Sequence, residues 1–195
     1  GEGPHVLDLC AAPGGKTLQL AAQGWQVTAL DISKRRLDLL KANLKRTGLK
    51  ANTVRADALK WEPKPQYDAI LLDAPCSATG TLRRHPDLPH ARDGSEIGDL
   101  IALQARMIDH ALGLLKPGGR LVFCTCSLIP DEGEVQAEEA IARHPGLTAD
   151  RAALDLPGLD PAWITEEGGL RLRPDFWPDL GGMDGFYVVV LRRPR

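Results

Sequence analysis

Short apolar runs alternate with longer amphipathic stretches along most of this chain. Six runs have the length and apolar content of buried strands: residues 5–10, 26–31, 51–57, 67–73, 120–126 and 185–193. Four stretches are predicted to be helices: residues 16–23, residues 33–48 with apolar residues at helical spacing, the amphipathic residues 99–115 and the acidic residues 131–143. In the second stretch, Ser33 is expected to cap the start of the helix and Gly48 to end it.

This alternation predicts an α/β fold with a doubly wound, mostly parallel sheet and helices on both faces. A ligand should then bind at the carboxyl ends of the strands. No internal repeat or low-complexity linker divides the sequence, so we expect one domain over residues 1–195. Residues 74–98 should form a long surface loop, and residues 145–178 show no clear pattern.

The composition fits one domain with its own core: 195 residues, of which 43% are hydrophobic and 26% charged. No apolar run approaches the roughly 18 residues of a membrane span, and no basic-then-apolar leader opens the sequence. We therefore expect a cytoplasmic protein without a membrane partner. The net charge of -2 lacks the basic excess of a self-sufficient nucleic-acid binder. The four cysteines lack zinc-site spacing and a nearby histidine, which favours reduced thiols and no metal.

A glycine turn joins the first strand to the first helix across residues 8–17, Asp-Leu-Cys-Ala-Ala-Pro-Gly-Gly-Lys-Thr. Gly14 and Gly15 let the backbone approach a ligand beside the positive end of the helix. The end of the turn also matches a phosphate-binding P-loop. However, that motif normally has glycine where this chain has Cys10, and Pro13 removes an amide that a phosphate would need. A P-loop nucleotidase is therefore the weaker alternative.

Three acids stand at the ends of successive strands: Asp31, Asp57 and Asp73. Asp31 follows the turn by about twenty residues, the distance at which a carboxylate can bind the hydroxyls of a ribose. Asp57 is placed to meet the amino group of an adenine. Alternatively, each acid only caps the helix that follows it. Their recurrence around a glycine turn favours an adenosine site.

Two cysteines follow neighbouring strands: Cys76 in Asp-Ala-Pro-Cys-Ser (73–77) and Cys126 in Thr-Cys-Ser (125–127). Because the carboxyl ends of parallel strands share one edge, both thiols and Asp73 should converge there. Cys124 alternates away from Cys126 and is expected to be a small buried hydrophobic residue.

These motifs, in this order and over nearly the whole chain, resemble the RNA cytosine-5 methyltransferases of the Sun/Fmu and nucleolar-protein type. Further matching pieces are residues 84–87, 116–119 and 184–186. The resemblance implies a Rossmann-like class I methyltransferase with a seven-stranded sheet and S-adenosylmethionine as cofactor. It implies that the methionine part is held by Cys10, Ala11, Ala12, Pro13, Gly14, Gly15 and Lys16. Asp31 would bind the ribose and Asp57 the adenine, with Asp73 near the sulfonium.

The resemblance also implies covalent catalysis, because carbon 5 of cytosine is a poor nucleophile until a thiolate adds to carbon 6. By this resemblance Cys126 attacks, although DNA cytosine-5 methyltransferases use the cysteine that would correspond to Cys76. A protonated Asp73 would stabilise the charge at N3, and Cys76 would help to release the product.

An unstacked cytosine in RNA is the expected substrate, in ribosomal RNA by resemblance. Residues 83–87 (Arg-Arg-His-Pro-Asp) are the local candidate for gripping it. Related enzymes usually carry an RNA-recognition domain ahead of the first strand, which this chain is expected to lack, and a monomer is expected. A module that binds S-adenosylmethionine without catalysis remains a further alternative.

Overall fold

The computed structural model describes residues 3–63, 66–91 and 93–195, and within them eight strands form one sheet. Its order is β3-β2-β1-β4-β5-β8-β6, with β7 paired to β8. The strands are β1 (His5–Leu9), β2 (Gln26–Asp31), β3 (Asn52–Arg55), β4 (Tyr67–Asp73), β5 (Leu115–Thr125), β6 (Thr148–Ala149), β7 (Leu170–Leu172) and β8 (Phe186–Arg192). Strands β1 to β5 pair in parallel, and β8 runs antiparallel to its three partners.

The expected doubly wound sheet is confirmed, but it has one strand more than the seven expected. The short strands β6 and β7 both lie within residues 145–178, which showed no hydrophobic pattern in the sequence. They are two and three residues long, too short for alternation to be recognised.

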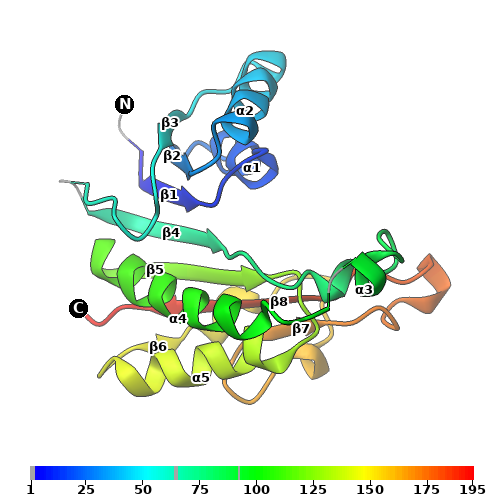
Figure 1. The fold of residues 1–195 in the computed structure, drawn as a ribbon. Helices are drawn as coiled ribbons and strands as arrows, with labels where there is room; N and C mark the ends of the chain where they lie inside the picture. The colour runs from blue at the N-terminus through cyan, green and yellow to red at the C-terminus, as the bar shows by residue number, and fades with distance from the viewer. Residues whose placement is uncertain (1–2, 64–65, 92) are drawn as a thin grey trace.

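The helices are α1 (Gly15–Ala22), α2 (Lys34–Thr47), α3 (Leu88–Ala91), α4 (Ile97–Leu114) and α5 (Glu134–Arg143). α4 and α5 pack side by side over β4, β5 and β8, whereas α1 and α2 pack against β2 and β3 (Figure 1). Successive residues of β2 belong to different core clusters, Ala29 to the one under α2 and Leu30 to the one under α4. Since successive strand residues point to opposite faces, the helices cover both faces of the sheet.

The local signals of the second helix are confirmed. The side chain of Ser33 accepts a hydrogen bond from the backbone amide of Arg36, and Gly48 ends the helix with φ +70°. Residues 74–98 are less irregular than expected, because they contain a 3-10 turn (Thr79–Thr81) and α3. β5 begins at Leu115, ahead of the turn at residues 116–119 that was expected to precede the strand.

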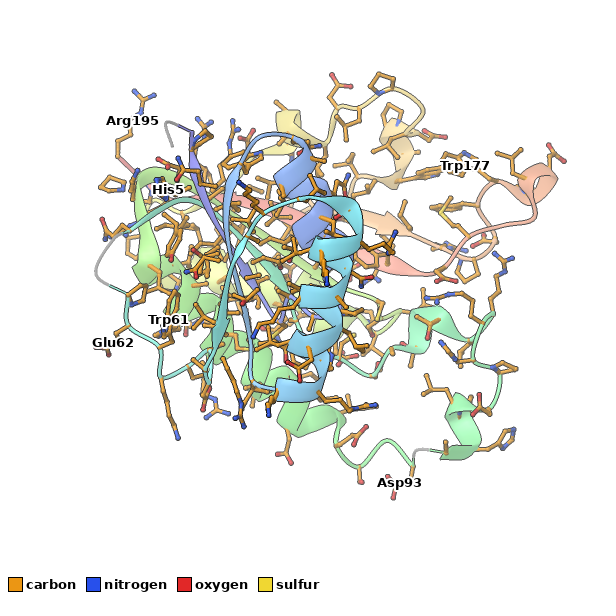
Figure 2. The ribbon with its side chains drawn as sticks, turned by 90° about the horizontal axis from the view of Figure 1, so that it is seen from above. His5, Trp61, Glu62, Asp93, Trp177 and Arg195 are labelled. Atoms are coloured by element: carbon orange, nitrogen blue, oxygen red, sulfur yellow. The ribbon has the colours of Figure 1, made fainter. Side chains whose placement is uncertain are left out.

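The carboxyl ends of the parallel strands form one edge of the sheet. Leu9 is in register with Leu30 and Leu72, and Asp73 with Cys124. Viewed from above, Trp177 and Asp93 lie at the end of the molecule opposite His5, where β1 begins (Figure 2). In the part of the chain that the structure describes, none of the helices is both long and apolar enough to cross a membrane.

Candidate functional site

The glycine turn after β1 brings its backbone close to the helices. Cys10 has φ +61° and Gly14 has φ +107°, both in the left-handed region. A Cβ at Gly14 would lie 2.9 Å from the side chain of Leu40, whereas Gly15 has open space beside it. Glycine at position 14 therefore serves both the backbone conformation and the close packing on α2.

Asp31 and Asp57 lie in one cavity of about 630 Å³ at the carboxyl edge of the sheet. Its wall also includes Cys10, Ile32, Arg36, Pro75, Leu103 and Met107. This volume is in the range that small-molecule ligands occupy in proteins. The two acids that the sequence assigned to one ligand are thus brought together at one cavity.

Both acids also accept hydrogen bonds from backbone amides, but Ser33 and not Asp31 caps α2, and the described residues between β3 and β4 form no helix for Asp57 to cap. Asp31 Oδ1 accepts from Ser33 N at 2.9 Å and Oδ2 from Ala12 N at 3.2 Å. Asp57 Oδ1 accepts from Leu59 N at 3.0 Å. A carboxylate has about four acceptor positions, so each acid keeps capacity for a ligand beside this role.

Asp73 pairs with the lysine of the glycine turn. Lys16 Nζ lies 2.7 Å from Asp73 Oδ2 and 5.6 Å from the centre of the Phe186 ring. Burial is the largest single effect and disfavours the ammonium, but the hydrogen bond to Asp73 and the negative charge of that carboxylate together with that of Asp8 outweigh it and raise the pKa of Lys16 above its usual range. This pairing suits an ionised carboxylate, whereas the role expected from the sequence requires a protonated Asp73.

The two expected cysteines meet. Cys76 Sγ and Cys126 Sγ lie 3.5 Å apart, and both side chains are half-buried. The hydrogen bond from Cys76 lowers the pKa of Cys126. That same contact, together with burial, raises the pKa of Cys76 far above its usual range, and the negative charge of Glu132 adds to the effect. The arrangement favours a thiolate at Cys126 and a thiol at Cys76.

Cys124 is buried, as expected, and its thiol donates to Asp73 Oδ1 at 3.6 Å. Burial and the charge of Asp73 hold the pKa of Cys124 well above its usual range. It is therefore a poor nucleophile in this setting.

Two buried acids belong to the site and were not singled out from the sequence. Asp8 accepts from Thr17 Oγ1 at 2.5 Å beneath the glycine turn, and burial raises the pKa of Asp8 to about 6. Glu132 is fully buried beneath the cysteine loops. The available signal for Asp8 was a carboxylate within an apolar strand. Glu132 belonged to residues 131–143, which were expected only to form an acidic helix.

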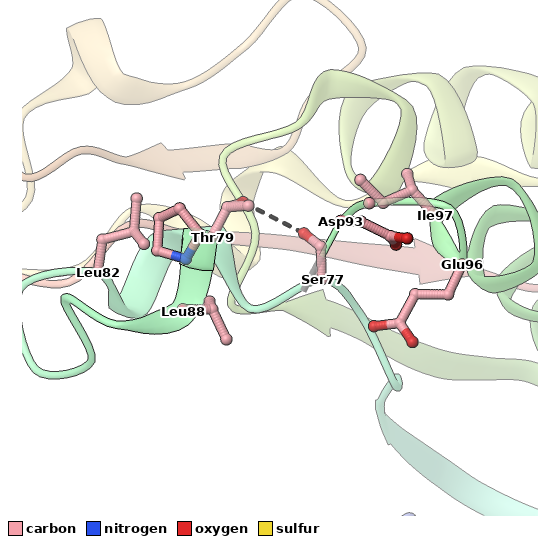
Figure 3. A pocket seen from close by; sticks show the side chains of 9 residues that line it. Ser77, Thr79, Leu82, Leu88, Asp93, Glu96 and Ile97 are labelled. Atoms are coloured by element: carbon pink, nitrogen blue, oxygen red, sulfur yellow. Dashed lines mark hydrogen bonds between the residues drawn. The ribbon is translucent and has the colours of Figure 1, made fainter. Parts of the chain in front are cut away.

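The segment 83–87, expected to grip RNA, is exposed throughout. Arg84 Nε lies 2.6 Å from Asp184 Oδ2, which ties the loop to the motif at residues 184–186. Next to this loop, a second cavity of about 240 Å³ lies between Ser77, Thr79, Leu82, Leu88 and Ile97 (Figure 3). Among the described residues, no group of three or more metal-ligating side chains is found.

The model of the 16S rRNA methyltransferase RsmB/F family matches residues 1–192. Ribosomal RNA small subunit methyltransferase B of Salmonella arizonae is 44% identical over 172 residues, and that of Klebsiella pneumoniae is 45% identical over 171. The matches cover 85% and 81% of this chain but 40% and 39% of those proteins. The chain thus spans about two fifths of the length of these relatives.

Solved structures agree over almost the whole chain. PH0851 superposes with a TM-score of 0.85 at 33% identity, covering 98% of this chain and 43% of that one. NSun6 from Pyrococcus horikoshii, determined with SFG, gives 0.83 at 30% identity and covers 98% of this chain and 48% of its own. The N-methyltransferase NodS from Bradyrhizobium japonicum, in complex with S-adenosyl-L-homocysteine, gives 0.59 at 15% identity, covering 98% of this chain and 79% of that one, and shares the fold alone.

Proposed function

Since the chain belongs to the RsmB/F family of 16S rRNA methyltransferases, we propose that it transfers a methyl group from S-adenosylmethionine to carbon 5 of a cytosine in ribosomal RNA. One observation carries the covalent mechanism: the thiols of Cys76 and Cys126 lie 3.5 Å apart at the edge of the sheet that also holds Asp73. Paired thiols suit a reaction in which one thiol adds to a base and a second group assists its release.

The residues of the large cavity fit the cofactor. Asp31 and Asp57 offer carboxylate acceptors for ribose hydroxyls and an adenine amine, and the apolar wall of Leu103 and Met107 suits a purine. Cys10, in the glycine turn, lines this cavity, and Lys16 of the same turn pairs with Asp73. When bound, S-adenosylmethionine supplies an electrophilic methyl group on a sulfonium.

Cys126 is the proposed nucleophile. Its thiolate forms the bond from Sγ to carbon 6, which leaves carbon 5 electron-rich and places negative charge on the ring toward N3. After methylation, Cys76 first releases its own proton to solvent and is then the proposed base that takes the carbon-5 proton. The electrons of that bond form the double bond between carbons 5 and 6 as the bond from Cys126 Sγ to carbon 6 breaks. This restores a Cys76 thiol beside a Cys126 thiolate, the pair whose sulfur atoms lie 3.5 Å apart.

Asp73 is proposed to face N3 of the base. Protonation at N3 needs a donor, and the Lys16 ammonium at 2.7 Å from Asp73 can supply it through that carboxylate. In this proposal Asp73 is not protonated throughout the reaction, as the sequence led us to expect. Instead, the ion pair of Lys16 and Asp73 delivers a proton to N3 as negative charge develops there.

The substrate is proposed to be a cytosine in a single-stranded or loop segment, because carbon 6 of a base stacked inside a duplex cannot reach a thiol in the protein. We propose that residues 1–195 act as one catalytic domain in the cytoplasm, as a monomer and away from membranes. RNA recognition by an upstream domain of the full-length protein fits the greater length of the relatives.

The test is a covalent trap with RNA containing 5-fluorocytidine, in which fluorine blocks the loss of the carbon-5 substituent. Wild type, Cys126→Ala and Cys76→Ala are incubated with this RNA and S-adenosylmethionine and separated under denaturing conditions. A protein–RNA adduct that is lost only with Cys126→Ala supports the assignment, and the reverse pattern would exchange the roles of Cys76 and Cys126.

Absence of any adduct, in folded protein that binds S-adenosylmethionine, would favour the non-catalytic binding module. Binding of ATP with magnesium in place of S-adenosylmethionine would favour the P-loop nucleotidase, although Pro13 offers no amide to a phosphate.

A further inference from the structure

A buried polar cluster lies beneath the two cysteine loops, and its centre is Glu132. This residue ends the 3-10 turn Pro130–Glu132, just before α5, and is fully buried. Its carboxylate accepts from Ser77 N at 2.9 Å through Oε1 and from Ser77 Oγ at 2.5 Å through Oε2. Ser77 directly follows Cys76, so the carboxylate fixes the backbone next to that thiol.

The second cysteine segment is bound to the same residue. Thr125 Oγ1 donates to the backbone carbonyl of Glu132 at 2.9 Å, and Ser77 Oγ lies 3.2 Å from Ser127 Oγ. Thr125 and Ser127 flank Cys126. The residues adjacent to both thiols therefore contact Glu132, directly or through one hydroxyl.

Helix α4 contributes Gln104 to the cluster. Gln104 Nε2 donates to Glu132 Oε1 at 3.1 Å and to the carbonyl of Pro75 at 2.8 Å, and Gln104 is fully buried. Thr79 Oγ1 completes the layer, at 3.3 Å from Ser77 Oγ and 3.1 Å from Ser127 Oγ; its contact with Ser77 is drawn in Figure 3.

The hydrogen bonds found for the Glu132 carboxylate come from a backbone amide, a hydroxyl and a side-chain amide. Burying a carboxylate among neutral donors is costly unless its hydrogen bonds are well made, and the loss of one partner leaves the others unsatisfied. Such a cluster specifies one arrangement of the loops more strongly than apolar packing would.

We propose that Glu132 is the positioning residue for both cysteine loops, and that its carboxylate sets the contact between the thiols of Cys76 and Cys126. The catalytic role of those thiols rests on the proposed function, but the positioning itself does not. The Glu132 carboxylate acts through Ser77, whose hydroxyl also contacts Ser127 beside Cys126, and it touches neither thiol in the contacts described above. The bond from Thr125 uses the backbone carbonyl of Glu132 and is kept in Glu132→Ala.

The test compares Glu132→Ala, Glu132→Gln and the control Glu139→Gln. Glu139 lies in α5, and its exposed carboxylate pairs with Arg143 and not with a residue of the cysteine loops. The first readout is the pH dependence of Cys126 alkylation by iodoacetamide, followed by mass spectrometry of the Cys126 peptide. The second is methyl transfer to RNA, with kcat separated from the KM for S-adenosylmethionine.

In Glu132→Ala we expect the alkylation midpoint of Cys126 to move to higher pH, because Cys76 no longer sits at hydrogen-bonding distance. We expect kcat to fall about 100-fold, with the KM for S-adenosylmethionine unchanged, since misplacement of a reacting group by about 1 Å has that effect. Glu132→Gln keeps an acceptor for Ser77 N and should recover part of both properties, and Glu139→Gln should behave like wild type.

An unchanged alkylation midpoint of Cys126 in Glu132→Ala would overturn the proposal. This holds even if methyl transfer falls, because a fall that only follows the loss of thermal stability shows a structural role and no positioning of the thiols. If Glu132→Ala does not fold, Ser77→Ala removes the hydroxyl link while keeping the backbone amide, and a midpoint unchanged there would have the same meaning. Alkylation needs neither RNA nor cofactor. A shifted midpoint in a protein that forms no RNA adduct would therefore support the positioning role while refuting the proposed function.

Discussion

Lys16 Nζ and Asp73 Oδ2 lie 2.7 Å apart, so that an ion pair joins the glycine turn after β1 to the last residue of β4. A second pair, Lys116 with Asp68, has the same distance and similar exposure but lies at the other end of β4. The two pairs differ mainly in their place relative to the carboxyl edge of the sheet. This makes one pair a matched control for the other.

We expect Lys16→Met to lower methyl transfer at least about tenfold, because Asp73 loses both its partner and its source of a proton. Lys116→Met should leave transfer near the wild-type rate, and both variants should lose little stability, since partly exposed ion pairs contribute at most about 1 kcal/mol. Single-turnover assays and thermal unfolding measure the two quantities. Equal loss of transfer in both variants would contradict a specific role for Lys16.

The contact between the two thiols predicts how Cys76 affects Cys126. In Cys76→Ala, the pKa of Cys126 should rise, because the hydrogen bond from Cys76 that favours the Cys126 thiolate is lost. Cys76→Ser keeps a donor and should shift it less. The rate of Cys126 alkylation as a function of pH gives the pKa directly, and identical profiles in wild type and Cys76→Ala would show that the contact does not act on Cys126.

The two acids of the large cavity should differ in what their removal costs. Asp57→Ala should weaken S-adenosylmethionine binding about tenfold, the effect of losing one hydrogen bond of about 1.4 kcal/mol, with stability little changed. Asp31→Ala should also destabilise the fold by about 2 kcal/mol, because its buried carboxylate binds the amides of Ala12 and Ser33. Calorimetric titration and denaturant unfolding separate the two effects. The exposed Asp38→Asn is the control, and unaltered affinity in Asp57→Ala would remove that residue from the site.

Asp8 should make stability depend on pH. Burial raises the pKa of Asp8 from 3.8 to about 6, so the folded state holds a proton that the unfolded chain releases between these values. Its stabilising contribution is therefore complete below about pH 4 and is lost as the pH rises through about 6. The shift of about two units corresponds to about 3 kcal/mol.

Asp8→Asn cannot ionise and should lack this loss. Urea unfolding from pH 4 to 8 should therefore show that the free energy of unfolding of Asp8→Asn rises relative to that of wild type up to about pH 6. Above that pH the difference between the two proteins should stay constant. Parallel curves for the two proteins would show that Asp8 does not titrate in this range.

Gly80 is pressed between two backbone carbonyls near Cys126. A Cβ at this position would lie 2.0 Å from the carbonyl oxygen of Gly185 and 2.9 Å from that of Cys126. Gly80→Ala should therefore destabilise the protein by about 2 kcal/mol or more and disturb the Cys126 segment. Gly98→Ala is the control, since a Cβ there meets nothing within 4 Å and α4 should become slightly more stable. Equal thermal unfolding of both variants would refute the close approach.

The sequence by itself determined the parallel part of the sheet and the edge at which the site lies. Apolar runs, Ser33 and Gly48 mark elements through interactions between near neighbours in the chain, and these survive in the fold. Once strands were parallel, their carboxyl ends had to share an edge, which brought Cys76 to Cys126 and Asp31 to Asp57.

Only the tertiary structure decided how these residues are supported. Lys16 contacts Asp73, which is 57 positions away in the sequence, and Ser77 contacts Glu132, which is 55 positions away. A periodic pattern of apolar residues does not indicate which side chains meet at such separations. The same holds for the short strands β6 and β7, which exist because β8 offers backbone partners to them. The local pattern determines which segments become strands and helices. The pairing of buried polar groups depends instead on how separate loops pack against one another. Each buried donor or acceptor needs a partner, and only the packed fold decides which residue supplies it.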